Sequence, residues 1–138
     1  MSRYLLDNGV LVAYLKGRPG ALRLIRPWIV NREVVTSVIV YGEAVEYMRG
    51  DTNFRQRRDE LRALLREVIP LTPTYAILER YADLRRELRR SGGLIGDIDT
   101  LIAATALDHN LTIVTLDSDF QRVPGLAVMR MSRAELMA

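Results

Sequence analysis

The sequence predicts an α/β fold, a parallel sheet with helices on both faces. Short apolar runs of strand length alternate along the chain with longer segments that have the periodicity of helices. These runs are continuously apolar, as strands are when both faces of a sheet are covered. With 138 residues and no repeat, linker or low-complexity segment, the chain is expected to form one domain over residues 1–138.

The first half of the chain is expected to contain two strands and four helices. Gly17 and Pro19 separate the first two helices, and the second places Leu22, Ile25 and Ile29 on one face. In chain order the expected elements are a strand at Arg3–Asp7, helices at Gly9–Lys16 and Ala21–Val30, a strand at Glu33–Ser37, and helices at Val38–Met48 and Asn53–Glu67.

The second half is expected to contain three strands and two helices. Thr72 and Pro73 start a long helix, with proline near its first turn, and Gly92 and Gly93 end it. Its apolar residues fall on one helical face, at Ile77, Tyr81, Leu84 and Leu88. The other elements are strands at Val68–Leu71, Thr112–Leu116 and, more weakly, Leu126–Met129, and a helix at Ile98–Leu107.

The chain has no cysteine and a single histidine, His109. This composition excludes disulfides and thiolate metal sites, and it argues against a histidine-based zinc site or a Ser-His-Asp triad. Any bound metal would therefore be held mainly by oxygen atoms. Oxygen ligands favour Mg²⁺ or Mn²⁺ over zinc or copper.

The charge of the chain suits a nucleic-acid substrate. The net charge is +3, and every cationic residue except Lys16 is an arginine, whose guanidinium group binds phosphate bidentately. Codon bias or adaptation to heat is the alternative explanation for this arginine content. No apolar run approaches the roughly 20 residues of a membrane span, and the first residues do not resemble a signal peptide. We therefore expect a cytoplasmic protein with no membrane partner.

Four carboxylates occupy positions where a metal-binding cluster would need them. They are Asp7, Glu43, Asp99 and Asp117. Asp7 and Asp117 follow the first and fourth predicted strands, and the ligands of a parallel sheet bind beyond the carboxyl ends of its strands. If these two strands are neighbours, both carboxylates lie in the same crevice. Carboxylates gathered there repel one another unless a cation lies between them, and Mg²⁺ or Mn²⁺ is the expected ion.

The length of the chain between Asp99 and Asp117 places both residues at one edge of the fold. A helix from Asp99 to Asp108 runs about 14 Å away from that edge, at about 1.5 Å per residue. The strand from Leu111 to Leu116 returns about 16–20 Å, at about 3.3 Å per residue. Because the helix and the strand cover similar distances in opposite directions, both aspartates are expected at the same edge.

Each of these acids also has a structural interpretation. Asp7 and Asp117 could be helix N-caps, as aspartate often is after a strand. Asp97 is expected to be the N-cap of the helix that carries Asp99, with contact to the metal as the alternative. Asp119 is expected to be a first-turn residue favoured by the helix dipole, with a fifth acid of the cluster as the alternative.

Several segments resemble the PIN-domain ribonucleases, and most closely the VapC toxins of bacterial and archaeal toxin–antitoxin pairs. The resemblance extends from about Tyr4 to Val128, nearly the whole chain, and its most specific part is the stretch from Asp99 through Ala104 and on to Asp117. The matching segments are Tyr4–Asp7, Ser37–Glu43, Ile95–Ala104 and Val114–Phe120.

The resemblance implies a PIN-like three-layer sandwich with five parallel strands in the order 3-2-1-4-5. It also implies a Mg²⁺- or Mn²⁺-dependent endoribonuclease that cleaves RNA with metal-activated water, dimerises, and is inhibited by a VapB-type antitoxin. The metal-binding acids would be Asp7, Glu43, Asp99 and Asp117, and Glu43 depends mostly on this resemblance. Thr115 or Ser37 would supply a supporting hydroxyl.

The chain departs from the family pattern at one position near these acids. Asn8 stands where the family often has threonine or serine, and an amide can still play a supporting role. Two other functions remain open from the sequence. One is a PIN-domain nuclease of RNA processing or decay, and the other is a catalytically silent PIN-fold module that acts through a partner.

Overall fold

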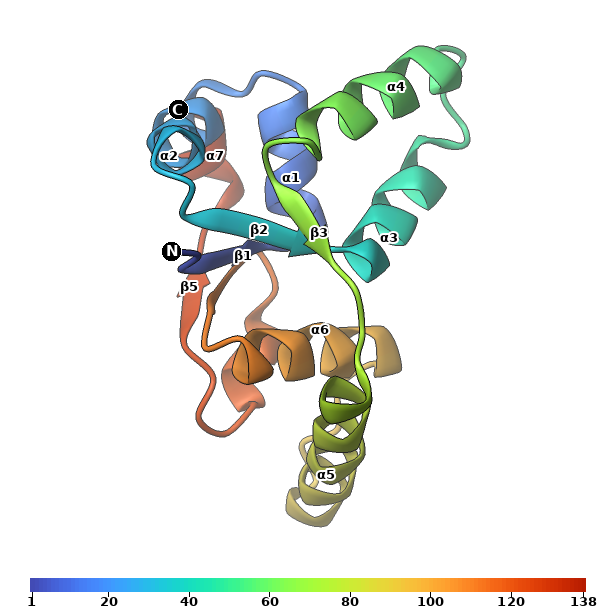
Figure 1. Ribbon diagram of the computed structural model, residues 1–138, viewed down its shortest axis with the longest axis vertical. Coiled ribbons are helices and arrows are strands. Elements are labelled where there is room, and N and C mark those ends of the chain that lie inside the picture. Colours follow the sequence, from blue (N-terminus) through green and yellow to red (C-terminus); the bar gives the residue numbers. More distant parts are fainter.

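Five parallel strands form one sheet in the order β3-β2-β1-β4-β5 (Figure 1). The computed structural model describes residues 1–138. The strands are β1 (Tyr4–Leu6), β2 (Val34–Ser37), β3 (Ile69–Leu71), β4 (Thr112–Thr115) and β5 (Val128–Arg130). The expected fold class and strand order are confirmed, and β1 and β4 are neighbours.

The register of the central strands aligns their carboxyl ends. Leu6 of β1 pairs with Val114 of β4, and the Asp7 N–H donates to the Val114 carbonyl at 3.0 Å. The Thr36 hydroxyl of β2 also donates to the Leu6 carbonyl, at 2.8 Å. Asp7 therefore leaves β1 beside the end of β4, as the parallel-sheet rule requires.

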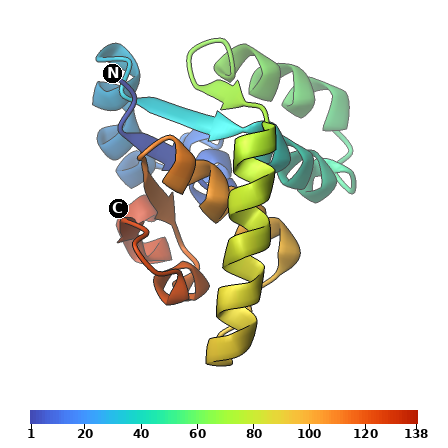
Figure 2. The same ribbon diagram turned by 60° about the horizontal axis from the view of Figure 1, so that its bottom comes forward.

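Helices cover both faces of the sheet and complete three layers. In Figure 1, α1, α2, α3, α4 and α7 lie on one face, and α5 and α6 lie on the other. Figure 2 shows α5 extending well beyond the sheet. The helices are α1 (Asn8–Leu15), α2 (Pro19–Val30), α3 (Val38–Met48), α4 (Phe54–Leu64), α5 (Tyr75–Ser91), α6 (Asp97–Asp108), the 3₁₀ helix η1 (Ser118–Arg122) and α7 (Arg133–Met137).

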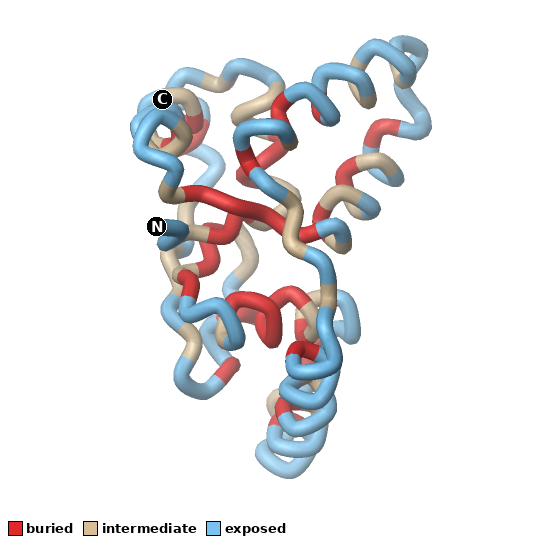
Figure 3. The backbone as a smooth tube through the Cα atoms, in the orientation of Figure 1, coloured by how far each residue is buried: buried red, intermediate tan, exposed pale blue.

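The core lies along the strands and the inner faces of the helices (Figure 3). Leu5, Leu6 and Ile113 have no exposed surface, and β2 is buried over its whole length. This two-sided burial explains why the strands read as continuous apolar runs. None of the helices combines the length and the apolar character that crossing a membrane requires.

Several helices differ from the sequence expectation. α4 ends at Leu64, three residues before the expected end, and α5 begins at Tyr75, after Pro73. α2 begins at Pro19, two residues early, because proline is well suited to the first helical position, where its missing N–H costs nothing. α7 is a helix that the periodicity does not predict. Its start is fixed by a capping box in which Ser132 and Glu135 each accept the other's backbone N–H. Leu136 of α7 is buried.

Candidate metal centre

Asp7 lies at the end of β1, and its carboxylate is held by Thr115 of β4. Thr115 Oγ1–H donates to Asp7 Oδ2 at 2.7 Å, and Thr115 Oγ1 accepts the Asp117 N–H at 3.0 Å. Asp7 is the N-cap residue of α1, but its side chain makes no capping hydrogen bond. Of the two hydroxyls considered, Thr115 contacts an acid, whereas Ser37 Oγ accepts the Ile39 N–H and caps α3.

Asp117 follows β4 and caps η1. Its Oδ1 accepts the Asp119 N–H at 2.9 Å, so the capping interpretation is confirmed for this residue. The capping bond uses one carboxylate oxygen and leaves Oδ2 for another ligand. Capping and metal binding are therefore compatible in Asp117.

The first turn of α6 brings Asp99 to the same edge. Carboxylate oxygens of Asp99, Asp117 and Asp119 lie within 4.8 Å of one another, close enough for one cation to contact all three. Asp119 does lie in the first turn of η1, as expected, but it is also a member of this acidic group. It was not among the four predicted metal ligands, although its spacing of two residues from Asp117 was an available signal.

Glu43 projects from α3 toward this edge and has an unpaired oxygen. Glu43 Oε1 is buried and has no hydrogen-bond partner. Burial raises the pKa of Glu43 to about 7, and the charges of Asp7 and Asp99 contribute to this increase. A buried, unpaired carboxylate is unstable in its charged form unless a cation or a proton neutralises it.

The charges of Asp7 and Glu43 interact with those of the group formed by Asp99, Asp117 and Asp119. Burial raises the pKa of Asp99 to about 6, with contributions from the charges of Asp7, Asp117 and Asp119. Burial also raises the pKa of Asp7, together with the charge of Asp117 and against the stabilising hydrogen bond from Thr115. Five carboxylates thus share one edge of the sheet, and we call them the acidic cluster: Asp7, Glu43, Asp99, Asp117 and Asp119.

Little positive charge from the chain compensates the acidic cluster. Arg122 contacts Asp119 at 3.5 Å, and the other four members form no ion pair. Arg85 Nη1 pairs instead with Asp97, at 2.7 Å. The interpretation of Asp97 as an N-cap was wrong: Gly96 is the N-cap of α6, and Asp97 is the first helical residue. Because position N1 cannot cap the helix, the exposed Asp97 carboxylate turns to Arg85.

The raised pKa values predict that metal-free protein becomes more stable as the pH falls. Glu43 and Asp99 bind protons more tightly in the folded than in the unfolded chain. Their protonation therefore contributes fully to the free energy of unfolding below the pKa values of the unfolded chain, 4.5 for Glu43 and 3.8 for Asp99. This contribution is lost as the pH rises through the folded-state pKa values of about 7 and about 6. In EDTA, we expect the free energy of unfolding to be about 1 kcal/mol higher near pH 5 than near pH 8, allowing for solvent screening.

Urea denaturation at the two pH values measures this difference. The Glu43→Gln variant is the control, because it removes one of the two titrating groups and should flatten the dependence. Stability that falls toward pH 5 in the wild-type protein, or a Glu43→Gln variant with an unchanged slope, would contradict the electrostatic account of the cluster.

The comparisons with known proteins agree with this architecture. The profile of the PIN domain matches residues 4–126. Ribonuclease VapC10 of Mycobacterium tuberculosis is 34% identical over 117 residues, which cover 82% of this chain and 81% of the relative. Ribonuclease VapC1 of Haemophilus influenzae is 29% identical over 125 residues, covering 89% of this chain and 93% of the relative.

A solved structure gives the same result at the level of the fold. The crystal structure of VapBC2 from Rickettsia felis, bound to a DNA fragment from its promoter, contains a chain that aligns with a TM-score of 0.84 and 25% identity. The alignment covers 94% of this chain and 98% of that chain. The chain therefore belongs to the PIN-domain family and, within it, to the VapC ribonucleases.

Proposed function

We propose that this protein is a divalent-metal-dependent endoribonuclease and the toxin of a VapB–VapC pair. The observation that carries the proposal is the acidic cluster, with the unpaired Glu43 Oε1 among carboxylates whose pKa values are raised. Such a cluster is unfavourable for folding alone, and a hard cation resolves the repulsion. Its position beyond the carboxyl ends of β1 and β4 is where parallel sheets bind ligands.

The residues present fit a Mg²⁺ or Mn²⁺ ion. The donors are all carboxylate oxygens, which hard cations prefer over softer ligands. Asp99, Asp117 and Asp119 would form the tightest part of the site, with Asp7 and Glu43 completing it. When bound, such an ion supplies charge neutralisation, polarisation of a phosphate oxygen and acidification of water.

Residues of the chain position the carboxylates and exchange protons at the site. Thr115 orients the Asp7 carboxylate and fixes the backbone of Asp117 through one hydroxyl. Because the pKa of the Glu43 carboxyl is raised to about 7, this group takes up a proton as the pH falls below neutral, and a bound cation would favour its ionised form. No side-chain nucleophile is needed for cleavage by water, in keeping with the absence of cysteine. By the family pattern, the products carry a 5′-phosphate and a 3′-hydroxyl.

Cleavage of a mixed RNA pool with added Mg²⁺, and with EDTA instead, tests the proposed activity. We expect cleavage with Mg²⁺ or Mn²⁺, none in EDTA, and recovery when metal is restored. Mapping of the product ends would identify the position of bond breakage. Cleavage that proceeds equally in EDTA would refute metal dependence, and no cleavage of any RNA would favour a silent PIN-fold module.

The Thr115 hydroxyl gives a separate prediction about positioning. Thr115→Val removes the hydrogen bonds to the Asp7 carboxylate and the Asp117 backbone while keeping the shape of the side chain. Removal of such a supporting hydrogen bond weakens metal affinity or activity by about 10–100-fold. We therefore expect the Mg²⁺ concentration for half-maximal cleavage to rise, which a titration of the initial rate measures.

Thr112→Val is the matched control because Thr112 belongs to the same strand and lies away from the acidic cluster. It should leave the Mg²⁺ dependence unchanged. If both threonine variants behave like the wild-type protein, Thr115 has no positioning role.

The antitoxin is the partner that the relatives suggest. The Rickettsia felis neighbour is a VapBC2 complex, and a neighbour from Haemophilus influenzae is a VapBC-1 structure with 27% identity and a TM-score of 0.75. We infer that a VapB-type protein binds this chain and covers the acidic cluster. A role in RNA processing or decay is the alternative. If the protein encoded by an adjacent reading frame inhibits cleavage, the toxin function is favoured over this alternative.

A further inference from the structure

A pocket adjoins the acidic cluster on the helical face that carries α1. It has a volume of about 450 Å³ and lies between α1, α3 and α7. Asn8, Gly9 and Leu116 line its end at the sheet edge, and they are the sequence neighbours of Asp7 and Asp117. One end of the pocket therefore lies beside the edge where the acids gather. Its apolar lining is completed by Val12, Ala13, Leu136 and Met137.

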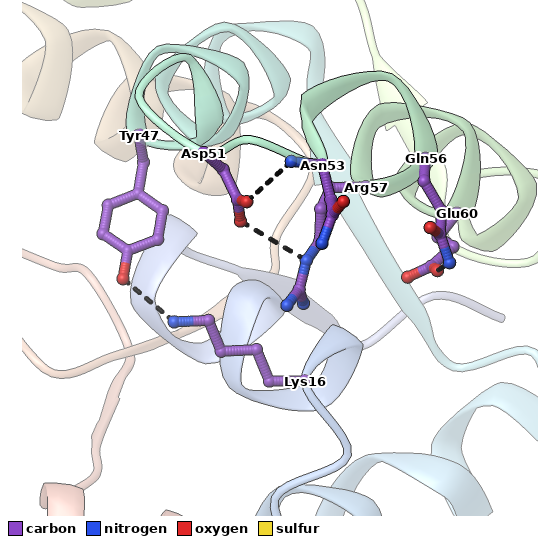
Figure 4. A network of polar contacts seen from close by, with 7 residues as sticks. All are labelled: Lys16, Tyr47, Asp51, Asn53, Gln56, Arg57 and Glu60. Carbon is purple, nitrogen blue, oxygen red and sulfur yellow. Dashed lines mark hydrogen bonds and ion pairs between the residues drawn. The ribbon is translucent and has the colours of Figure 1, made fainter.

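Three cations line this pocket: Lys16, Arg18 and Arg133. None of them forms an ion pair with a carboxylate, and no acidic residue lines the pocket. Lys16 Nζ donates instead to Tyr47 Oη at 2.9 Å (Figure 4). In the same view, Asp51 is directed toward Asn53 and Arg57, away from Lys16.

The three cations act on the same group. The pKa of the Tyr47 phenol is lowered, first by the hydrogen bond and charge of Lys16 and then by Arg133 and Arg18. Their charges thus converge at one end of the pocket from α1, from the turn before α2 and from α7. Like charges gathered in this way repel, and an anion among them removes the repulsion.

Two arginines on the α6 and η1 side of the acidic cluster already have partners. Arg85 is engaged by Asp97 and by the Ile95 carbonyl. Arg122 is engaged by Asp119 and by the Leu94 carbonyl. On the side of α1 and α7, a polyanion that approaches the carboxylates finds the free positive charge of Lys16, Arg18 and Arg133. The unpaired cations of the pocket favour an anion that extends from the acidic edge into it.

We propose that the pocket binds a nucleotide of the RNA strand on the α1 side of the cleaved phosphodiester bond, with a phosphate among Lys16, Arg18 and Arg133. The proposal rests on the proposed ribonuclease function and names where that substrate is held. The volume is in the range of sites for small ligands. The apolar lining would pack against the ribose and base, and the exposed Tyr47 ring offers a surface on which a base can stack.

The Lys16→Gln/Arg133→Gln double variant tests this assignment with a short fluorescent RNA. Both side chains are exposed, so the fold should be retained. We expect KM to rise about 10-fold or more with kcat nearly unchanged, because the variant cannot form charge-assisted hydrogen bonds to phosphate. The slope of log affinity against log salt, measured by fluorescence polarisation, should decrease by about 0.7 for each phosphate that the variant no longer neutralises.

The Arg23→Gln/Arg55→Gln variant is the matched control. It removes the same charge from exposed positions on α2 and α4, outside the pocket, and should change neither KM nor the salt slope. If wild-type protein cleaves RNA and the pocket variant keeps the KM and slope of the control, the assignment is overturned and the pocket is left to a protein partner. If wild-type protein does not cleave RNA, the proposed function fails, and a reduced salt slope in the pocket variant alone would still support RNA binding there.

Discussion

The Asp99→Asn variant is expected to lose RNA cleavage by about 10³-fold, because it removes a central carboxylate of the proposed metal site. The substitution keeps the shape of the side chain and removes its charge. Asp99 lies in the first turn of α6, and its carboxylate is within 4.8 Å of those of Asp117 and Asp119. A neutral amide weakens the binding of a divalent ion at the point where the carboxylates converge.

The same variant should be more stable than the wild-type protein in EDTA. Burial and the charges of Asp7, Asp117 and Asp119 raise the pKa of Asp99 to about 6, so its ionised form destabilises the fold at higher pH. Asp108→Asn is the matched control, since Asp108 is the exposed last residue of the same helix. Initial cleavage rates and urea denaturation measure the two effects. Retained cleavage in Asp99→Asn would contradict the site, whatever the change in stability.

The Gly20→Ala variant is expected to lose about 2–3 kcal/mol of stability, because overpacking against backbone forces neighbouring segments apart. A Cβ atom at Gly20 would overlap the Glu135 carbonyl oxygen and would lie 2.8 Å from the Leu136 carbonyl carbon. Both atoms belong to the backbone of α7, which cannot rotate away as a flexible side chain would. We expect α7 to be displaced from α2 and Leu136 to become exposed.

Gly42→Ala provides the control for this prediction. Gly42 lies within α3, and a Cβ atom there would meet nothing within 4 Å. Alanine is favoured over glycine inside a helix by about 0.5–1 kcal/mol, so this variant should be more stable than the wild-type protein. Denaturation midpoints for the two variants should therefore shift in opposite directions. If Gly20→Ala matches the wild-type protein, α7 does not pack on α2 at this position.

The strands and most helices could be predicted from the sequence because burial on both faces leaves a simple pattern. The run Leu111–Leu116, for example, contains β4 and leads to Asp117. α7 is different, since it has only five residues and depends on packing against α2. The capping box formed by Ser132 and Glu135 was its available signal. The close approach of α7 to Gly20 is a tertiary contact that no local pattern contains.

Part of the acidic cluster could also be predicted, for a geometric reason. Strand ends fix the positions of Asp7 and Asp117, and the length of α6 fixes that of Asp99. The direction of a side chain is not contained in such spacing. Asp97 and Asp99 are two residues apart, yet Asp97 turns to Arg85 while Asp99 joins the cluster. Asp119 joins it because η1 is a tight 3₁₀ turn, and Glu43 was expected mainly from the family resemblance.

Calorimetric titration of the metal-free protein with Mn²⁺ near pH 7 tests the central claim most directly. In buffers of different ionisation enthalpy, the wild-type protein should bind Mn²⁺ and release protons, since the pKa of Glu43 is raised to about 7 and that of Asp99 to about 6. The Asp7→Asn variant should bind Mn²⁺ much more weakly. Undiminished Mn²⁺ binding by Asp7→Asn, or no binding by the wild-type protein, would contradict the metal centre.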